Sequence, residues 1–249
     1  AIADKFQPVH CPKALFAVCG DSGIIHCISN PFRLMTRCLL TIIFAFSLVA
    51  SINAQDRLQD FDTARQLFWE SVYPSGGWTL YCGLRFEAQG NADNIMATID
   101  HIYTMPRVYE QLQCQSRLQC KQSKPKQYNR IEADLHNMYP AMGELVISRT
   151  DTVFGELEAD ASRYDNCDFE RRRRVIEPRD IAKGNIARSL LYMRHEYGLD
   201  LPEGLELLKA WSRADPPSEQ EINRNDVIEK LQGNRNPFID HPERVRQLK

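Results

Sequence analysis

One apolar segment near the start of the chain limits most strongly what the remainder can fold into. Residues 38–50 are mostly apolar, the short basic stretch 35–37 precedes them, and residues 51–54 end in a small side chain. This order is typical of a secretory signal peptide, and we predict one at residues 35–54. The run is shorter than the roughly 20 apolar residues of a membrane-spanning helix, so we expect no stable membrane insertion. A buried core helix is the alternative interpretation.

The residues in front of this segment, 1–34, do not resemble a signal peptide, which normally begins at a start methionine. We interpret them as an upstream extension of the reading frame or as a disordered leader. A small metal site is the alternative, but the spacing of its possible ligands matches no standard zinc pattern. These ligands are His10, Cys11, Cys19, His26 and Cys27. The predicted organisation is an extension at 1–34, a signal peptide at 35–54 and one folded domain at 55–249.

Cysteine usage supports export. Four of the eight cysteines remain after the predicted cleavage, and they are Cys82, Cys114, Cys120 and Cys167. An even number of cysteines in an exported chain indicates disulfides. Cys114 and Cys120 are close enough in the sequence to close a short loop, which leaves Cys82 to pair with Cys167. By the loop-entropy estimate the short disulfide alone would stabilise the fold by roughly 2 kcal/mol.

The charge of the chain excludes a globally basic nucleic-acid binder. The net charge is -2, with 43% hydrophobic and 26% charged residues, which is ordinary for a soluble globular protein. Any contact with nucleic acid must therefore use local basic patches. One such patch has no acidic residue within it and comprises Lys121, Lys124, Lys126 and Arg130. A second basic run, at 171–174, is surrounded by acidic residues, and we interpret it as a solvated surface.

Hydrophobic spacing and chain-breaking residues predict the secondary structure of the domain. Alternating apolar residues predict strands at 78–86 and 95–99, and the second strand would end in Asp100 and His101. Helices are expected at 56–72, 130–138, 180–197, 205–211 and 219–231. Polar loop or irregular structure is expected at 114–127 and 144–179. The fold class is therefore α+β, richer in helix than in strand.

A base and two hard oxygen ligands occur where this fold could bring them together. Asp100 and His101 end a predicted strand, and Asn137 lies in the predicted helix 130–138. Histidine suits a general base because its unperturbed pKa is near neutrality. Aspartate and asparagine oxygens suit Mg²⁺. From these residues alone, a surface or capping pair remains the more common explanation of an Asp-His dipeptide.

Four blocks of sequence change that balance. Residues 131–144 read IEADLHNMYPAMGE, and residues 183–188 read KGNIAR, followed by Tyr192 and Met193. Residues 232–238 read QGNRNPF, and residues 78–83 read WTLYCG. In the order in which they occur along the chain, these blocks resemble the signatures of the endonuclease I family. The resemblance extends over roughly residues 60–240.

The resemblance implies a ββα-metal active site with assigned roles. His101 would be the general base, and Asp100 and Asn137 would hold Mg²⁺, with Mn²⁺ or Ca²⁺ as alternatives. Arg117 falls where the family places an arginine that stabilises the pentavalent phosphate, a task that suits its planar guanidinium. The disulfide Cys114–Cys120 would hold the loop of that arginine.

The sequence departs from the family pattern beside the predicted base. Many relatives have Glu-His where this chain has Asp100 and His101. Aspartate keeps the charge but is one methylene shorter, which would shift or weaken metal binding. Relatives also commonly follow the histidine with Val-Val-Pro-Ala, whereas here residues 102–105 read IYTM and the proline is displaced to Pro106.

The sequence therefore predicts a secreted or periplasmic, monomeric, Mg²⁺-dependent endonuclease. It would hydrolyse single- and double-stranded DNA, and RNA as an alternative substrate, with little sequence preference and with 5′-phosphate products. A secreted nucleic-acid-binding protein without catalysis is the first alternative. A disulfide-stabilised structural or inhibitory protein is the second, but it would not need a base, two ligands and an arginine together.

Overall fold

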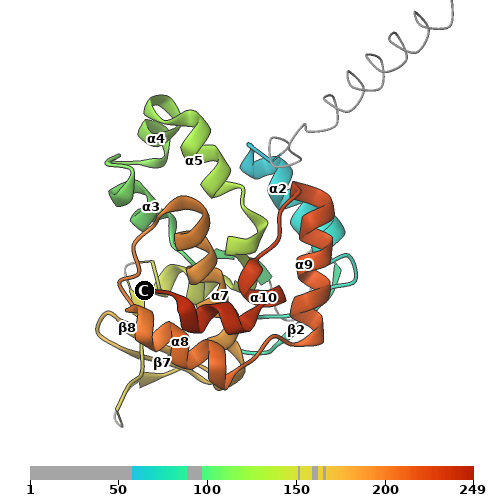
Figure 1. Ribbon diagram of the computed structural model, residues 1–249. Coiled ribbons are helices and arrows are strands. Elements are labelled where there is room, and N and C mark those ends of the chain that lie inside the picture. Colours follow the sequence, from blue (N-terminus) through green and yellow to red (C-terminus); the bar gives the residue numbers. More distant parts are fainter. Residues whose placement is uncertain (1–57, 89–96, 151, 159–161, 165–166) are drawn as a thin grey trace, which may run out of the picture. The chain divides into compact units, whose positions relative to one another are not determined.

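The computed structural model describes residues 58–88, 97–150, 152–158, 162–164 and 167–249. The chain divides into two units, Ala1–Ser51 and Ile52–Lys249, and all described residues belong to the second unit. The predicted extension and signal peptide lie outside the described residues. Figure 1 shows the second unit as a mixture of helices and short strands, which confirms the predicted α+β class.

A strand–strand–helix unit carries the residues that the sequence singled out. Strand β3 (Ala97–His101) pairs antiparallel with β4 (Met138–Met142), with His101 opposite Met138. Helix α6 (Gly143–Ser148) follows β4 directly and packs against both strands. Successive side chains of a strand point to opposite faces, so Asp100 and His101 face different sides of this hairpin.

The helices cover these strands and one another. The first begins at α2 (Phe61–Leu67), where the Asp60 side chain caps the helix, and continues as the π-helical turn η2 (Phe68–Val72). The others are α3 (Met105–Gln111), α4 (Arg117–Ser123), α5 (Pro125–Glu132), α7 (Asp180–Tyr197), α8 (Leu205–Ala214), α9 (Glu219–Gln232) and α10 (Pro237–Asp240). Short 3-10 turns occur at η4 (Leu135–Asn137) and η5 (Pro242–Gln247). The helices predicted at 180–197, 205–211 and 219–231 are confirmed.

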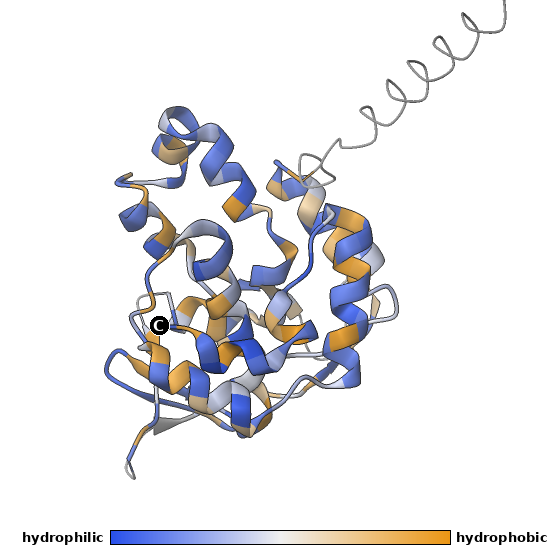
Figure 2. Ribbon diagram, viewed as in Figure 1, coloured by the Kyte–Doolittle hydropathy of each residue, from blue (hydrophilic) through white to orange (hydrophobic). Residues whose placement is uncertain are grey.

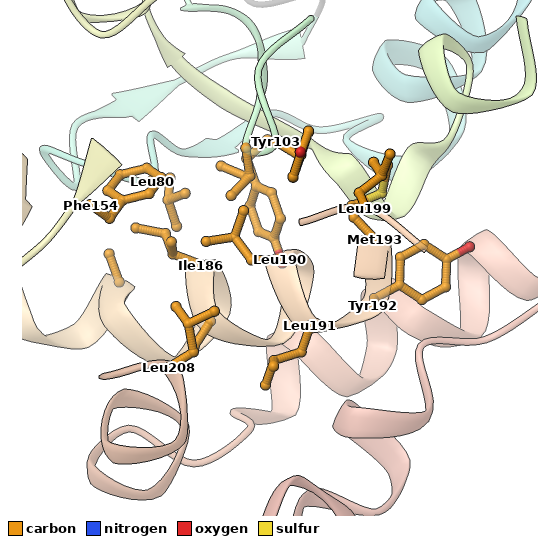
Figure 3. Close-up of a cluster of buried hydrophobic side chains, with 14 of the residues drawn as sticks. Leu80, Tyr103, Phe154, Ile186, Leu190, Leu191, Tyr192, Met193, Leu199 and Leu208 are labelled. Atoms are coloured by element: carbon orange, nitrogen blue, oxygen red, sulfur yellow. The ribbon is translucent and has the colours of Figure 1, made fainter. Parts of the chain in front are cut away.

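Helix α7 forms the centre of the main hydrophobic core. Its buried face carries Ile186, Leu190 and Met193, the three residues whose spacing predicted the helix. Figure 3 shows this face packed with side chains from distant parts of the chain, among them Tyr103 and Phe154. A second cluster lies between η2, α9 and the start of β4, and it contains Phe68, Leu135, Met138 and Ile228.

The remaining strands are short. β1 (Gly77–Trp78) and β2 (Arg85–Phe86) form a two-stranded hairpin. A separate four-stranded sheet has the order β5-β8-β7-β6, and its strands are Val153–Phe154, Val175–Pro178, Phe169–Arg172 and Ser162–Arg163. Both predicted disulfides are present, Cys82–Cys167 and Cys114–Cys120. None of the described helices is both long enough and apolar enough to span a bilayer.

Four sequence predictions of secondary structure are wrong. The segment 114–127, expected to be a polar loop, forms α4 and the start of α5, because Ser116 caps the first helix and Pro125 begins the second. The helix expected at 130–138 ends at Glu132, and Met138 begins a strand that contains Pro140. The region 144–179, expected to be irregular, contains α6 and the four-stranded sheet.

The strand expected at 78–86 is also corrected, because it is a turn between two very short strands. The turn is tight: Leu84 N–H donates to the Thr79 hydroxyl, and Gly83 N–H donates to the Thr79 carbonyl. The strand expected at 95–99 is confirmed over residues 97–101, and it delivers Asp100 and His101 at its end.

Candidate active site

His101 ends β3 in a partly buried position with one ring nitrogen fixed. Its Nε2 lies 2.9 Å from the backbone carbonyl oxygen of Glu132. A carbonyl oxygen only accepts hydrogen bonds, so Nε2 carries the proton and Nδ1 keeps its lone pair. Burial lowers the pKa of His101 below its usual 6.5, against the opposing influence of the Glu132 carbonyl and Asp100. The imidazole is therefore neutral at neutral pH and able to accept a proton.

The side chain of Glu132 anchors two basic residues beside this histidine. It is only 4% exposed, and its Oε1 accepts hydrogen bonds from Arg117 Nε at 2.5 Å and from the Tyr128 hydroxyl at 2.8 Å. Lys121 Nζ lies 3.3 Å from Oε2. Burial alone would raise the pKa of Glu132, but these partners lower it overall, so the carboxylate is charged.

Arg117 is the first residue of α4, and its position is set by the N-cap Ser116. Its side chain is 49% exposed beyond the contact with Glu132. The guanidinium carbon lies 5.9 Å from the centroid of the Phe61 ring, and the ring of His101 lies 5.5 Å from the same centroid. The structure therefore brings the predicted base and the predicted phosphate-binding arginine together around Glu132 and Phe61.

Asp100 points to the opposite face of the hairpin. It is 2% exposed, and both carboxylate oxygens have protein partners: the Tyr81 hydroxyl donates to Oδ2 at 2.5 Å, and Arg149 Nη1 donates to Oδ1 at 3.0 Å. Burial raises the pKa of Asp100, while Arg149 and Tyr81 oppose that shift. Arg149 also donates to the carbonyls of His101 and Ile102, so it braces the end of β3.

Asn137 is fully buried at the end of η4, where it clamps the chain that follows His101. Its Oδ1 accepts a hydrogen bond from Tyr103 N–H at 2.7 Å, and its Nδ2 donates to the Tyr103 carbonyl at 3.0 Å. Its own carbonyl accepts from Ile102 N–H. The predicted position of Asn137 on a continuous helix is corrected to a 3-10 turn before β4.

The two predicted metal ligands do not form an open metal site in this arrangement. Every side-chain oxygen and nitrogen of Asp100 and Asn137 already has a protein partner. The cation next to Asp100 is the guanidinium of Arg149. Within the described part of the chain, no three His, Cys, Asp or Glu side chains lie together as a metal-binding group. The assignment of Asp100 and Asn137 as ligands stays a prediction.

Comparison with known proteins decides the family. A family model described as endonuclease I matches residues 62–243. The chain belongs to the endonuclease I family. An extracellular deoxyribonuclease of Aeromonas hydrophila is 33% identical over 83% of this chain and 98% of the relative. A periplasmic deoxyribonuclease of the same species is 32% identical over 85% of this chain and 98% of the relative. An extracellular ribonuclease of Bacillus subtilis (strain 168) is 35% identical over 44% of each chain.

The match confirms the family that the motif blocks indicated. The protein is therefore a nuclease, an enzyme that hydrolyses phosphodiester bonds. The interpretation as a structural or inhibitory protein is not supported. Sequence reasoning missed Glu132, although it lies in the quoted block 131–144. Its only signal was an acidic residue one helical turn after Tyr128 on an otherwise apolar face.

The basic patch predicted at residues 121–130 of this chain divides between two environments. Lys121 joins the Glu132 cluster, and Lys126 is exposed near the start of α5. Lys124 lies partly exposed at the junction of α4 and α5. Arg130 turns elsewhere, with Nη2 3.5 Å from Glu196 Oε1. Figure 2 colours most of α4 and α5 hydrophilic, which suits a surface that meets a charged partner.

Proposed function

We propose that the protein is an exported, metal-dependent endonuclease that hydrolyses DNA, and RNA as a further substrate, with little sequence preference and with 5′-phosphate products. The observation that carries this proposal is the imidazole of His101. Its Nε2 is committed to the Glu132 carbonyl, and its Nδ1 is left as a base. Family membership supplies the reaction class.

In the proposed reaction, Nδ1 of His101 accepts a proton from the attacking water. The geometry favours this role because the carbonyl of Glu132 fixes the tautomer and would stabilise the imidazolium that forms. The lowered pKa keeps the base unprotonated at neutral pH. The ring of Phe61 limits the space around the imidazole and so restricts how it can rotate.

Arg117 is the proposed stabiliser of the charge that develops on the phosphate. Glu132 holds its Nε, and the half-exposed remainder of the guanidinium can bond phosphate oxygens. Lys121 adds a second positive charge at the same carboxylate. The carboxylate of Glu132 therefore acts as a positioning group for both cations.

The endonuclease I family is a family of metal-dependent nucleases. A bound Mg²⁺, Mn²⁺ or Ca²⁺ would neutralise charge on the scissile phosphate. Asp100 and Asn137 are the proposed ligands by resemblance, but both side chains are buried and hydrogen-bonded within the protein. The burial and hydrogen bonding of these two ligands favour a second candidate function, that of a nucleic-acid-binding protein with weak or lost catalysis.

The substrate and location follow from the relatives and the surface. The relatives named deoxyribonuclease and ribonuclease support both nucleic acids as substrates. Lys121, Lys124, Lys126 and Arg130 are the proposed contacts with phosphates, and binding through them would weaken as salt rises. Extracellular and periplasmic relatives, together with two disulfides, support export, and the proposed state of the exported protein is a monomer. Its mature form would begin near Gln55, which mass spectrometry of the exported protein can test.

Plasmid incubated with the protein and Mg²⁺, with and without chelator, separates the two candidates. The nuclease proposal expects nicked and linear products that disappear with chelator and with His101→Ala. Binding of the plasmid without any cleavage, over a range of Mg²⁺, Mn²⁺ and Ca²⁺ concentrations, would instead support the binding protein. Ligation of the products without prior phosphorylation tests for 5′-phosphate ends.

A further inference from the structure

A cavity of about 690 Å³ lies apart from His101 and has no role in the proposed reaction. It is bounded by the end of η2, the β1 hairpin and the N-terminal parts of α7 and α9. The side chains that matter here are those of Trp78, Arg179, Asn185 and Arg224.

Arg224 enters the cavity wall from α9 with part of its bonding capacity unused. It is 8% exposed, and its Nη2 donates to the carbonyls of Leu135 and Met138. Its Nε and Nη1 have no hydrogen-bond partner among the described residues. The nearby phenol of Tyr73 interacts with the guanidinium. A buried cation with unused N–H groups favours an anion nearby.

Arg179 provides a second guanidinium that lacks a carboxylate. Its Nε donates to the Leu80 carbonyl at 2.9 Å, and its Nη2 lies 3.3 Å from the Thr79 carbonyl. No carboxylate of the described residues forms an ion pair with Arg179 or Arg224.

Two acidic residues line the cavity, and one of them is already neutralised. Glu221 is held by Arg188 through two hydrogen bonds, at 2.8 and 2.5 Å. Asp215 accepts a hydrogen bond from Gly184 N–H. Arg179, Arg224 and Arg188, which pairs with Glu221 but does not itself line the cavity, together outnumber the two carboxylates by one positive charge.

Trp78 adds an aromatic surface at the same cavity. It is 55% exposed, although most large aromatic side chains of the fold are buried. Gly76 precedes it with φ at 78°, and a side chain there would collide with the Phe86 carbonyl, so the turn that presents Trp78 needs glycine. An exposed indole beside cations is the combination that binds single-stranded nucleic acid, by stacking a base and attracting its phosphate.

We propose that this cavity is a nucleotide-binding subsite, in which the base stacks on Trp78 and the phosphate is bound by Arg179 and Arg224. Its volume lies within the roughly 300–1,000 Å³ of small-ligand pockets and accommodates one nucleotide. The subsite rests on the proposed function for its ligand class. It would hold an unpaired nucleotide of the substrate strand at a distance from the scissile phosphate. Arg224 connects the subsite to the active site, since it donates to the carbonyl of Met138, the residue opposite His101.

Calorimetric titration with deoxyadenosine 5′-monophosphate in the presence of chelator tests the subsite without turnover. Deoxyadenosine and inorganic phosphate, titrated separately, distinguish base from phosphate recognition. Trp78→Ala should weaken binding of the monophosphate and of deoxyadenosine about tenfold, the effect of losing one stacked base. Asn185→Asp keeps the shape but adds a carboxylate near the guanidiniums, and it should weaken only the monophosphate.

Two controls make the result decisive. Ile147→Ala alters another exposed apolar residue, on α6 and outside the cavity, and should bind like the unmodified protein. His101→Ala should also bind normally, so a protein without nuclease activity could still confirm the subsite. Absence of saturable monophosphate binding would overturn the proposal even if the enzyme cleaves DNA, and so would monophosphate binding by Trp78→Ala and Asn185→Asp as tight as that of the unmodified protein.

Discussion

The imidazole Nε2 of His101 and the backbone carbonyl of Glu132 lie 2.9 Å apart, while the side chain of Glu132 holds Arg117. One residue at the end of α5 thus fixes the proposed base through its main chain and the proposed phosphate-binding arginine through its carboxylate. The two halves of this relationship can be separated by mutation, because a change of the side chain leaves the carbonyl in place.

We expect Glu132→Gln to lower kcat about tenfold or more, equivalent to roughly 1.4 kcal/mol of transition-state stabilisation. The amide has the same shape but no charge to hold Arg117 and Lys121. The acidic fall of the pH profile should move only towards lower pH, because His101 keeps its carbonyl partner but loses a nearby carboxylate charge that raises its pKa. Steady-state kinetics across pH measures both quantities, with the exposed Glu144→Gln as control. A variant with unchanged kcat would show that Glu132 does not position the arginine.

Arg117→Ala should lower kcat by roughly 10² or more, as expected for loss of one electrostatic stabiliser of the transition state. Binding of DNA should change less, since Lys121 and the other basic residues remain. Arg130→Ala is the matched control for kcat, because it removes another proposed phosphate contact, one that faces Glu196 and the ring of Tyr197 instead of Glu132. A large loss of DNA affinity with unchanged kcat would make Arg117 a positioning contact only.

Asp100→Asn removes the carboxylate that pairs with Arg149 inside the protein. Breaking a buried ion pair leaves a charge uncompensated, and we expect the free energy of unfolding to fall by about 3 kcal/mol. Urea denaturation measures this loss, with Thr98→Ser on the same strand as control. If Asp100 also binds the metal, raising Mg²⁺ should restore part of the activity of Asp100→Asn but none of that of His101→Ala. An unchanged stability would contradict the pairing with Arg149.

The two disulfides should differ in their contribution to stability. The residues of Cys82–Cys167 are 85 positions apart, and those of Cys114–Cys120 are six apart. Loop entropy predicts that replacing the first pair with serine costs about 4–5 kcal/mol and the second about 2 kcal/mol. Urea unfolding of the two double variants provides the comparison. Equal losses would mean that strain or residual structure, rather than loop length, sets their effect.

Local sequence patterns predicted those elements whose own residues define them. Ile186, Leu190 and Met193 repeat at helical spacing because α7 buries one face. Helices α4 and α5 lack such a pattern, and the cap Ser116 and the N-terminal Pro125 define them instead. The spacing of Ile131, Leu135 and Met138 suggested one helix, but Met138 is buried by pairing with β3, a contact that no local pattern encodes.

The candidate site could likewise be predicted only in part from the sequence. The base and the arginine followed from the resemblance, and the structure places both beside Glu132. Glu132 itself could not be assigned, because its role depends on α4 folding back over α5. The partners of Asp100 were equally hidden, since Tyr81 and Arg149 lie 19 and 49 residues away in the chain.

The pH profile of kcat/KM for the unmodified enzyme and for His101→Ala tests the central claim most directly. Only the neutral imidazole accepts a proton, and burial lowers its pKa, so the unmodified enzyme should stay active until the pH falls below 6.5. His101→Ala should lose about 10²–10⁴ in rate at neutral pH, and the acidic fall of the profile should disappear. Full activity of folded His101→Ala at neutral pH, with the same acidic fall, would remove His101 from the reaction.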